Sequence, residues 1–173
     1  MTDAPLTNDR QRTYTWADTA PTLAALRTLS GLEFMHAIAR GDLHPSPVGM
    51  TLGMEPLREE DFTEGRAVFR LKPQEFHYNP IGSVHGGVFA TLLDSVVGCA
   101  VHSTLPAGKA YTTLEIKVNM IKALRVDSPP VTAVGSIVSV GSRVAIATGQ
   151  IEDTDGRIYA TASTTCLIFD APG

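Results

Sequence analysis

Four residues with chemically useful groups fall within sixteen positions of this 173-residue sequence: Asn79, His85, Gly86 and Asp94. An aspartate can activate water or attack a carbonyl carbon, and an imidazole or an amide side chain can orient a substrate. Free main-chain N–H groups, such as that of Gly86, can stabilise an oxyanion. Together they place an amide side chain, an imidazole, a main-chain oxyanion donor and a carboxylate base near one end of a helix.

Asp94 interrupts the apolar run VFATLLDSVVGCAV, which lacks the alternation of a strand and is interpreted as part of a long helix, buried on most sides. Burial disfavours an ionised carboxylate, so an acid here indicates either a use in chemistry or a structural partner, such as a loop or a basic residue. At 100° per residue, one helix face carries Gly87, Ala90, Thr91, Asp94, Val97, Gly98 and Val101, opposite Phe89, Leu92, Val96 and Cys99.

His85-Gly86-Gly87 leads directly into this helix. A helix start offers free amides and a partial positive charge, so the amides of Gly86 and Gly87 are candidates for an oxyanion site. The alternative is a tight loop with a solvent-facing histidine.

The elements before the helix are short. We expect a mobile arm over residues 1–18, a turn or two over 21–29, and a helix that starts at a capping box of Ser30 and Glu33 and ends at Gly41. The prolines of LHPSPVG, residues 43–49, predict no regular structure. We therefore predict an N-terminal helical extension, 1–45, followed by a main domain, 46–170.

Strand periodicity dominates the main domain. RAVFRLK and TTLEIKVNM alternate with a period of two, and the second places Leu114, Ile116, Val118 and Met120 on one face. VTAVGSIVSV and RVAIATGQIE are joined at Gly141-Ser142, which suits a type II′ turn, and DTDG turns the chain into a last strand. The pattern of two strands, one helix and four strands predicts an α+β fold, an antiparallel sheet wrapped around one long central helix.

Composition excludes several classes of protein. A net charge of −4 and scattered basic residues argue against a nucleic-acid partner. Cys99 and Cys166 lie in apolar stretches, as in a reducing compartment, and no export signal or membrane span is recognised, so we expect a cytoplasmic protein without a membrane partner. The other histidines show no metal-type spacing, and no G-x-S-x-G, P-loop or dinucleotide motif occurs, so we expect no metal and no cofactor.

The run from Asn79 to Asp94, NPIGSVHGGVFATLLD, resembles the signature of the PaaI-like (phenylacetate-degradation type) hotdog-fold acyl-CoA thioesterases, and the resemblance extends over about residues 30–169. It implies a hotdog fold, a homodimer joined edge to edge or a homotetramer, and active sites at the subunit interface. It also implies hydrolysis of acyl-CoA to free acid and CoA.

The resemblance assigns roles to individual positions. Asp94 becomes the general base or nucleophile, the Gly86 amide becomes the oxyanion donor, and Asn79 and His85 place the thioester or the water. Thr113 matches a hydroxyl position that holds the water and should come from the same subunit as Asp94, facing Asn79, His85 and Gly86 of the other. Thr112 competes for the Thr113 role, and Gly87 is a further substrate contact.

The chain departs from the family pattern where many members have Arg-Pro, since Lys122-Ala123 stands there instead. Lys122, Arg125 and Arg143 are the candidates for CoA-phosphate contacts, although each also fits a solvated charge. Two other functions stay open on the same fold. A non-catalytic acyl-CoA sensor would need an added DNA-binding segment, and a hydratase or dehydratase would need a closer Asp and His pair.

Overall fold

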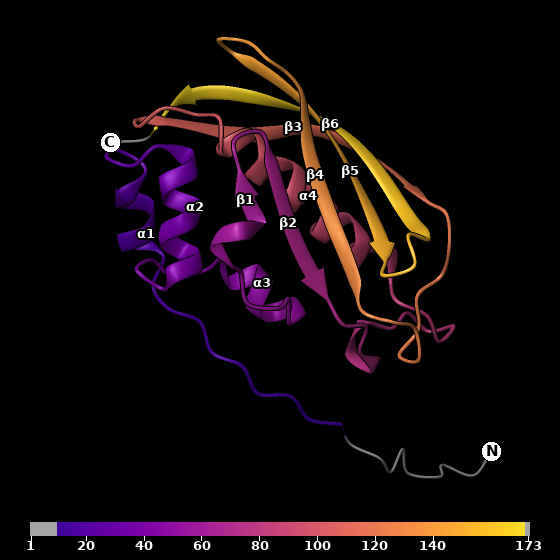
Figure 1. Cartoon of the computed structure of the whole chain (residues 1–173). Coiled ribbons are helices and arrows are strands. Elements are labelled where there is room, and N and C mark those ends of the chain that lie inside the picture. Colours follow the sequence, from indigo (N-terminus) through magenta and orange to yellow (C-terminus); the bar gives the residue numbers. More distant parts are fainter. Residues whose placement is uncertain (1–9, 172–173) are drawn as a thin grey trace, which may run out of the picture.

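A computed structural model describes residues 10–171 of the chain. It shows one six-stranded antiparallel sheet curved around a single long helix, α4 (Gly86–His102) (Figure 1). The predicted α+β architecture, with two strands before the helix and four after it, is confirmed. The strands, in sheet order, are β1 (Phe62–Thr63), β2 (Arg66–Leu71), β4 (Val131–Val140), β5 (Val144–Asp153), β6 (Ile158–Asp170) and β3 (Lys109–Met120).

The helix α4 packs into the concave face of the sheet through a stripe of fully buried aliphatic residues. Burial of this stripe stabilises the domain by about 1.5–3 kcal/mol for each Leu or Val side chain that is removed from water. At Gly135 on β4 the two backbones meet, because a Cβ built there would lie 2.4 Å from the carbonyl oxygen of Val96. The buried stripe comprises Leu92, Leu93, Val96, Val97 and Ala100.

No helix in the described part of the chain is long and apolar enough to cross a membrane.

Three short helices precede the sheet: α1 (Ala20–Ala25), α2 (Gly31–Arg40) and α3 (Pro47–Leu52). The capping box at the start of α2 is confirmed, since the Ser30 side chain accepts from the Glu33 N–H while the Glu33 carboxylate accepts from the Ser30 N–H. Gly41 ends α2 with a φ of 84°.

The absence of regular structure predicted for residues 43–49 is wrong at its C-terminal end, where α3 begins. Pro47 occupies the first turn of α3, where a missing N–H breaks no helical hydrogen bond and the fixed φ already suits a helix. Because α3 lies beyond residue 45, the helical layer is longer than the predicted extension, and a domain boundary at that residue stays a prediction.

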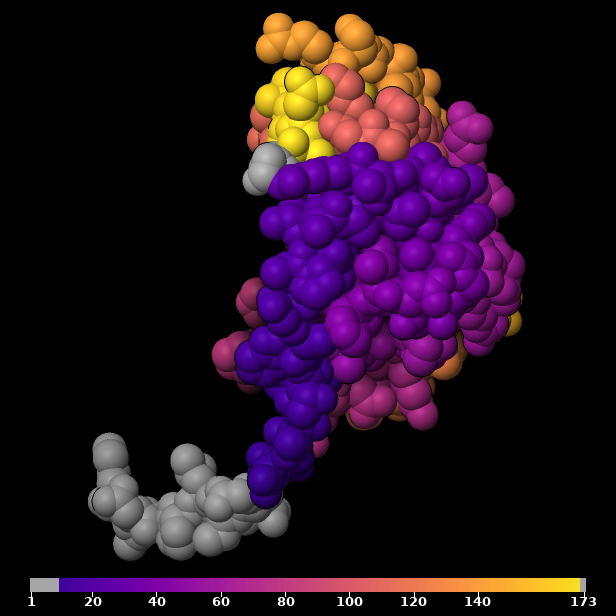
Figure 2. Space-filling view, turned by 90° about the vertical axis from the view of Figure 1, so that its left-hand side faces the viewer, coloured from indigo at the N-terminus to yellow at the C-terminus, as the bar shows by residue number. Residues whose placement is uncertain are grey.

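The helical layer docks beside the C-terminal end of α4. Gly31 donates its N–H to Leu105 O at 2.8 Å, and Gly108 donates its N–H to Leu26 O at 2.9 Å. In the space-filling view this segment covers one face of the molecule as a continuous band (Figure 2). Further contacts come from the arm, where Arg12 donates to the carbonyls of Met50 and Thr51 at the end of α3. The predicted mobile arm is therefore held at Arg12, while residues 1–9 lie outside the described range.

The strand β3 contains a bulge that the periodicity did not predict. The pairing with β6 shifts between Thr113 and Glu115, and Leu114 is 57% exposed. The placement of Leu114 on a buried face is therefore wrong. The extra residue interrupts the alternation of side chains between the two faces of the strand. Thr113 before the bulge and Met120 after it, seven residues apart, therefore both face α4.

Two turns complete the sheet. The type II′ turn predicted at Gly141-Ser142 is wrong, because no residue of this loop has a positive φ, although Gly141 N–H does close the hairpin on Val144 O at 2.8 Å. The DTDG turn is confirmed, with Gly156 at a φ of 75° and its N–H donated to Asp153 O.

Candidate active site

His85 is the N-cap of α4. Its Nδ1 accepts a hydrogen bond from the Gly87 N–H at 2.9 Å, so the ring proton of the neutral imidazole lies on Nε2. The ring is exposed, which leaves Nε2–H available as a donor. The N–H of Gly87, a residue predicted as a substrate contact, is thus already used in the helix cap.

Gly86 is the first residue of the helix, and its N–H makes no hydrogen bond with the described part of the chain. This amide has the free donor and the positive helix end that an oxyanion needs. A Cβ at this position would lie 2.7 Å from Cε of Met120, so a larger residue would make the Met120 side chain move. The Met120 side chain, flexible and largely exposed, therefore rests beside the candidate oxyanion position.

Asn79 organises the loop that leads to the helix. Its Oδ1 accepts from the N–H groups of Ile81 and Ser83, and its Nδ2 donates to Ser83 Oγ at 3.1 Å. Gly82 completes the turn with a φ of 78°. The side chain predicted to place the thioester or the water is thus engaged in holding the loop next to His85.

Asp94 and Thr113 meet directly, as Thr113 Oγ1 donates to Asp94 Oδ1 at 2.9 Å within one chain. Thr112 is exposed and lies on the other face of β3, so the structure favours Thr113 of the two candidates. Asp94 itself is exposed, so the expectation of a buried carboxylate is wrong, although the helix is buried on most sides as predicted. Asp94 and Gly87 lie on the part of α4 that stays open to solvent.

The two halves of the predicted site do not meet within a single chain. Asp94 follows Gly86 by eight residues, which places it about 12 Å further along the helix axis. A single thioester carbonyl contacts both its attacking water and its oxyanion donor at about 3 Å. One chain therefore brings together Asp94 and Thr113, and separately Asn79, His85 and Gly86.

The three candidate phosphate-binding cations lie at two ends of the sheet. Lys122 and Arg125 are exposed just after Met120, in a segment that joins the helix-start loop through the Val84 N–H to Leu124 O bond at 2.9 Å. Arg143 is exposed in the β4–β5 hairpin, near the β6 residues that pair with Thr112. The strand length between these positions is about 25 Å, so the two groups cannot contact the same phosphate within one chain.

Two groups near the site, the half-buried Tyr111 and the buried His102, were not singled out from the sequence. Tyr111 packs so closely on α4 that a Cβ at Gly98 would lie 2.4 Å from its Oη. A glycine one turn after an acid in a helix is a signal of such a close approach. His102, 5% exposed, has no hydrogen-bond partner for either ring nitrogen among the described residues, and burial lowers its pKa to about 4.

The buried cysteines and histidines show no sign of a metal centre. Cys99 and Cys166 are free thiols, as predicted for small residues of the core. The His77 ring links two main-chain segments, accepting from Gln74 N–H at 3.0 Å and lying 2.7 Å from Leu52 O. Among the described residues, no three His, Cys, Asp or Glu side chains gather closely enough to hold a metal ion.

An antiparallel sheet wrapped around one long helix, with a capped helix start and a carboxylate on the open helix face, defines a protein of the hotdog fold. Solved structures agree. PaaI from the phenylacetic acid degradation operon of Escherichia coli superposes with a TM-score of 0.69 at 18% identity, over 83% of this chain and 98% of that chain. A Streptococcus mutans protein bound to acetyl-CoA superposes with a TM-score of 0.59 at 21% identity, over 65% and 87%.

Sequence comparison agrees with the fold. Residues 81–160 match the model of the thioesterase superfamily. A Halobacterium salinarum protein, named for an inferred esterase activity, is 37% identical over 93 residues, which is 51% of this chain and 60% of that protein. The match thus spans less than two thirds of this relative. Residues 81–160 are thus similar to the thioesterase superfamily, and the predicted resemblance to PaaI-like hotdog proteins is confirmed.

Proposed function

We propose that the protein hydrolyses acyl-CoA thioesters to a free acid and CoA. The observation that carries this proposal is the Thr113 to Asp94 hydrogen bond of 2.9 Å, which holds a carboxylate on the exposed face of a helix whose capped N-terminus offers a free amide. The match of residues 81–160 to the thioesterase superfamily supports hydrolysis as the general reaction.

The reaction follows from these groups by one of two routes. In the first, Asp94 removes a proton from water, and the resulting hydroxide attacks the thioester carbonyl carbon. In the second, Asp94 attacks that carbon itself and forms an anhydride, which water then hydrolyses. In both, the Gly86 N–H stabilises the tetrahedral oxyanion, the C–S bond breaks, and the CoA thiolate takes up a proton.

A second copy of the chain would complete the site. Asp94 and Gly86 are about 12 Å apart along one helix, so a shared site needs Asp94 and Thr113 from one subunit and Gly86, His85 and the Asn79 loop from its partner. Strand β3 lies at the edge of the sheet, where its free N–H and C=O groups can pair with a second β3. We therefore propose a homodimer joined edge to edge, alone or within a tetramer.

We propose that the CoA moiety binds near the exposed basic side chains of Lys122, Arg125 and Arg143. Lys122 and Arg125 lie beside the helix start and suit the pantetheine side of the proposed oxyanion site, while Arg143 could approach the same ligand only from another subunit. The acetyl-CoA bound to the Streptococcus mutans relative of the same fold supports a CoA ester as the ligand class. Free Cys99 and Cys166 fit a reducing compartment, and we propose the cytoplasm.

Release of free thiol from short, long and aromatic acyl-CoA esters tests the activity. Substitution Asp94→Asn should lower kcat/KM by about 10²- to 10⁴-fold because the variant can neither take a proton nor attack. Asp127→Asn, which neutralises an exposed loop carboxylate, is the matched control and should retain wild-type turnover.

Two results would contradict the proposal. Full activity of Asp94→Asn would remove the carboxylate from the mechanism. Tight binding of acyl-CoA without any turnover by the wild type would instead indicate a sensor on the same fold.

A further inference from the structure

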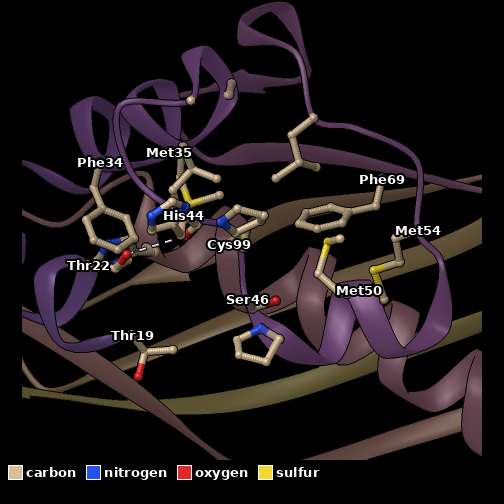
Figure 3. A pocket seen from close by; sticks show the side chains of 18 of the residues that line it. Thr19, Thr22, Phe34, Met35, His44, Ser46, Met50, Met54, Phe69 and Cys99 are labelled. Carbon is tan, nitrogen blue, oxygen red and sulfur yellow. Dashed lines mark hydrogen bonds between the residues drawn. The ribbon is translucent and has the colours of Figure 1, made fainter. Parts of the chain in front are cut away.

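A large cavity lies at the opposite end of α4 from the helix start, between the helical layer and the sheet. Its volume is about 760 Å³, within the range of about 300–1,000 Å³ typical of small-molecule pockets. Figure 3 shows side chains from the three N-terminal helices and from β2 directed into a common space. Its apolar walls include Leu26, Phe34, Ile38, Met50, Met54 and Phe69.

The chemistry of the walls selects an uncharged hydrocarbon group. Arg40 is at the rim, but its guanidinium pairs with Asp42 at 2.9 Å and Glu59 at 3.2 Å, so it does not serve a ligand carboxylate. Several of the lining residues are methionines, whose unbranched side chains adapt to ligands of varied shape. Leu23 is 53% exposed at the rim, which leaves the cavity open to solvent.

One wall of the cavity adjoins the proposed catalytic carboxylate. Tyr111 lines the cavity, and Thr113, which holds Asp94, lies two residues further along the same face of β3, or about 7 Å. Gly98, one turn after Asp94, provides the space in which the Tyr111 ring lies. Burial, with the charge of Asp94 adding to it, raises the pKa of Cys99 in the same wall to about 12.

We infer that this cavity holds the hydrocarbon part of the acyl group, with the thioester carbonyl at Asp94 and the chain running past Tyr111 beneath α1, α2 and α3. The predicted substrates are uncharged aliphatic acyl-CoA esters of medium length. This inference rests on the proposed function and assigns to the N-terminal helices the choice of substrate. A terminal carboxylate, as in succinyl-CoA, would be disfavoured because Arg40, the guanidinium in the cavity lining, is already paired with Asp42 and Glu59.

The chain supplies a mild way to fill the cavity. Gly49 lies in α3 without a positive φ, and a Cβ added there meets only Ser46 Oγ at 3.5 Å and Met54 Sδ at 3.7 Å, both in the cavity wall. Substitution Gly49→Leu should therefore occupy the cavity without straining the backbone. Gly49→Ala, which adds one methyl group, is the matched control.

The measurement is kcat/KM for acetyl-, butanoyl-, hexanoyl-, octanoyl- and decanoyl-CoA. Each methylene that loses its place should lower kcat/KM about fourfold, so Gly49→Leu should lose at least about tenfold on octanoyl-CoA and stay within about twofold on acetyl-CoA. Ala39→Leu, from the α2 wall, should shift the same profile. An unchanged chain-length profile in both variants, with acetyl-CoA turnover intact, would overturn the inference and leave the thioesterase proposal standing.

A binding measurement separates the two proposals further. ¹³C-labelled decanoate, the product of the longest ester, should bind wild type and Asp94→Asn, and Gly49→Leu should weaken its binding at least about tenfold. Binding of this kind in a protein that turns over no thioester would contradict the proposed function while supporting the cavity. Decanoate binding that Gly49→Leu leaves unchanged would place the hydrocarbon elsewhere. If Gly49→Leu changes the oligomeric state of the protein but leaves the chain-length profile of kcat/KM unchanged, a second copy of the chain fills the cavity in place of the acyl group.

Discussion

Asp94 carries its charge at low energetic cost in the single chain because its carboxylate is exposed and accepts a hydrogen bond from Thr113. Water around an exposed carboxylate screens it and stabilises the ionised form. In the proposed shared site, substrate and the partner subunit cover this helix face, and the carboxylate loses that water. Thr113 is then the group that keeps it aligned.

Removal of the Thr113 hydroxyl tests this role. Thr113→Val should lower kcat about tenfold, since one neutral hydrogen bond to a charged group contributes about 1.5 kcal/mol, with a smaller effect on KM. Thr113→Ser keeps the hydroxyl and should recover most of the rate. Thr112→Val, at the exposed neighbour on the other strand face, serves as the control. Equal effects of the two valine variants would argue for a general change in the strand.

His102 predicts an acid-sensitive stability. Burial between Phe34 and Tyr111 lowers its pKa from 6.5 to about 4. A depressed histidine pKa means that the unfolded chain takes up a proton first, so stability falls as the pH drops from about 6.5 towards 4, by up to about 3 kcal/mol.

His102→Phe keeps an aromatic ring in this position and removes both the titration and two unsatisfied nitrogen atoms. Denaturant unfolding at pH 7.5 and pH 4.5 should show a smaller loss of stability for the variant than for wild type. A wild type and a variant that lose the same free energy over this range would show that His102 does not titrate with folding.

At the scale of the elements, the contact between α4 and β4 determines how deeply the helix lies in the sheet. Gly135→Ala would place a methyl group 2.4 Å from the Val96 carbonyl oxygen, and the obstacle is backbone that cannot rotate away. We expect a loss of about 3 kcal/mol, or about 6–12 °C in the midpoint of thermal unfolding. Gly49→Ala, which meets only ordinary contacts in α3, should change the midpoint by less than about 2 °C.

The elements that follow from local rules could be predicted from sequence. The capping box of Ser30 and Glu33, the DTDG turn and the apolar length of α4 depend on neighbours along the chain, and all three are confirmed. The hydrogen bond between Asp94 and Thr113 joins two residues that the family resemblance had already paired.

Features that depend on distant contacts were missed. The bulge at Leu114 reflects the pairing of β3 with β6, so a simple alternation placed Leu114 on the wrong face. The exposure of Asp94 depends on which helix face the sheet covers, and composition alone cannot decide that. The cavity is lined by residues of α1, α2 and α3 together with residues near the C-terminal end of α4, a meeting of segments far apart in the chain that local patterns do not predict.

At the scale of the whole molecule, a shared site predicts complementation between two inactive variants. Asp94→Asn and His85→Ala each damage a different half of the site, so each homodimer should be nearly inactive. In a mixed dimer, one of the two sites would receive an intact Asp94 from one subunit and an intact His85 from the other.

Mixing denatured variants in equal amounts and refolding them should restore about a quarter of wild-type activity, because half of the dimers are mixed and each has one intact site. Separately refolded variants, combined afterwards, provide the control for residual activity. No recovery in refolded mixtures that contain mixed dimers, detected by two distinguishable affinity tags, would show that one chain supplies the entire site.

The single helix α4 has a wider consequence, since 17 residues of one rigid element carry the proposed oxyanion amide of one shared site at one end, the proposed catalytic carboxylate of the other site in the middle and a wall of the cavity at the other end. The spacing of these groups along the helix axis is therefore fixed. Substitutions in α1, α2 and α3 can lengthen or shorten the space proposed for the acyl chain without changing that spacing. Substrate range and catalytic power can therefore evolve independently in this molecule.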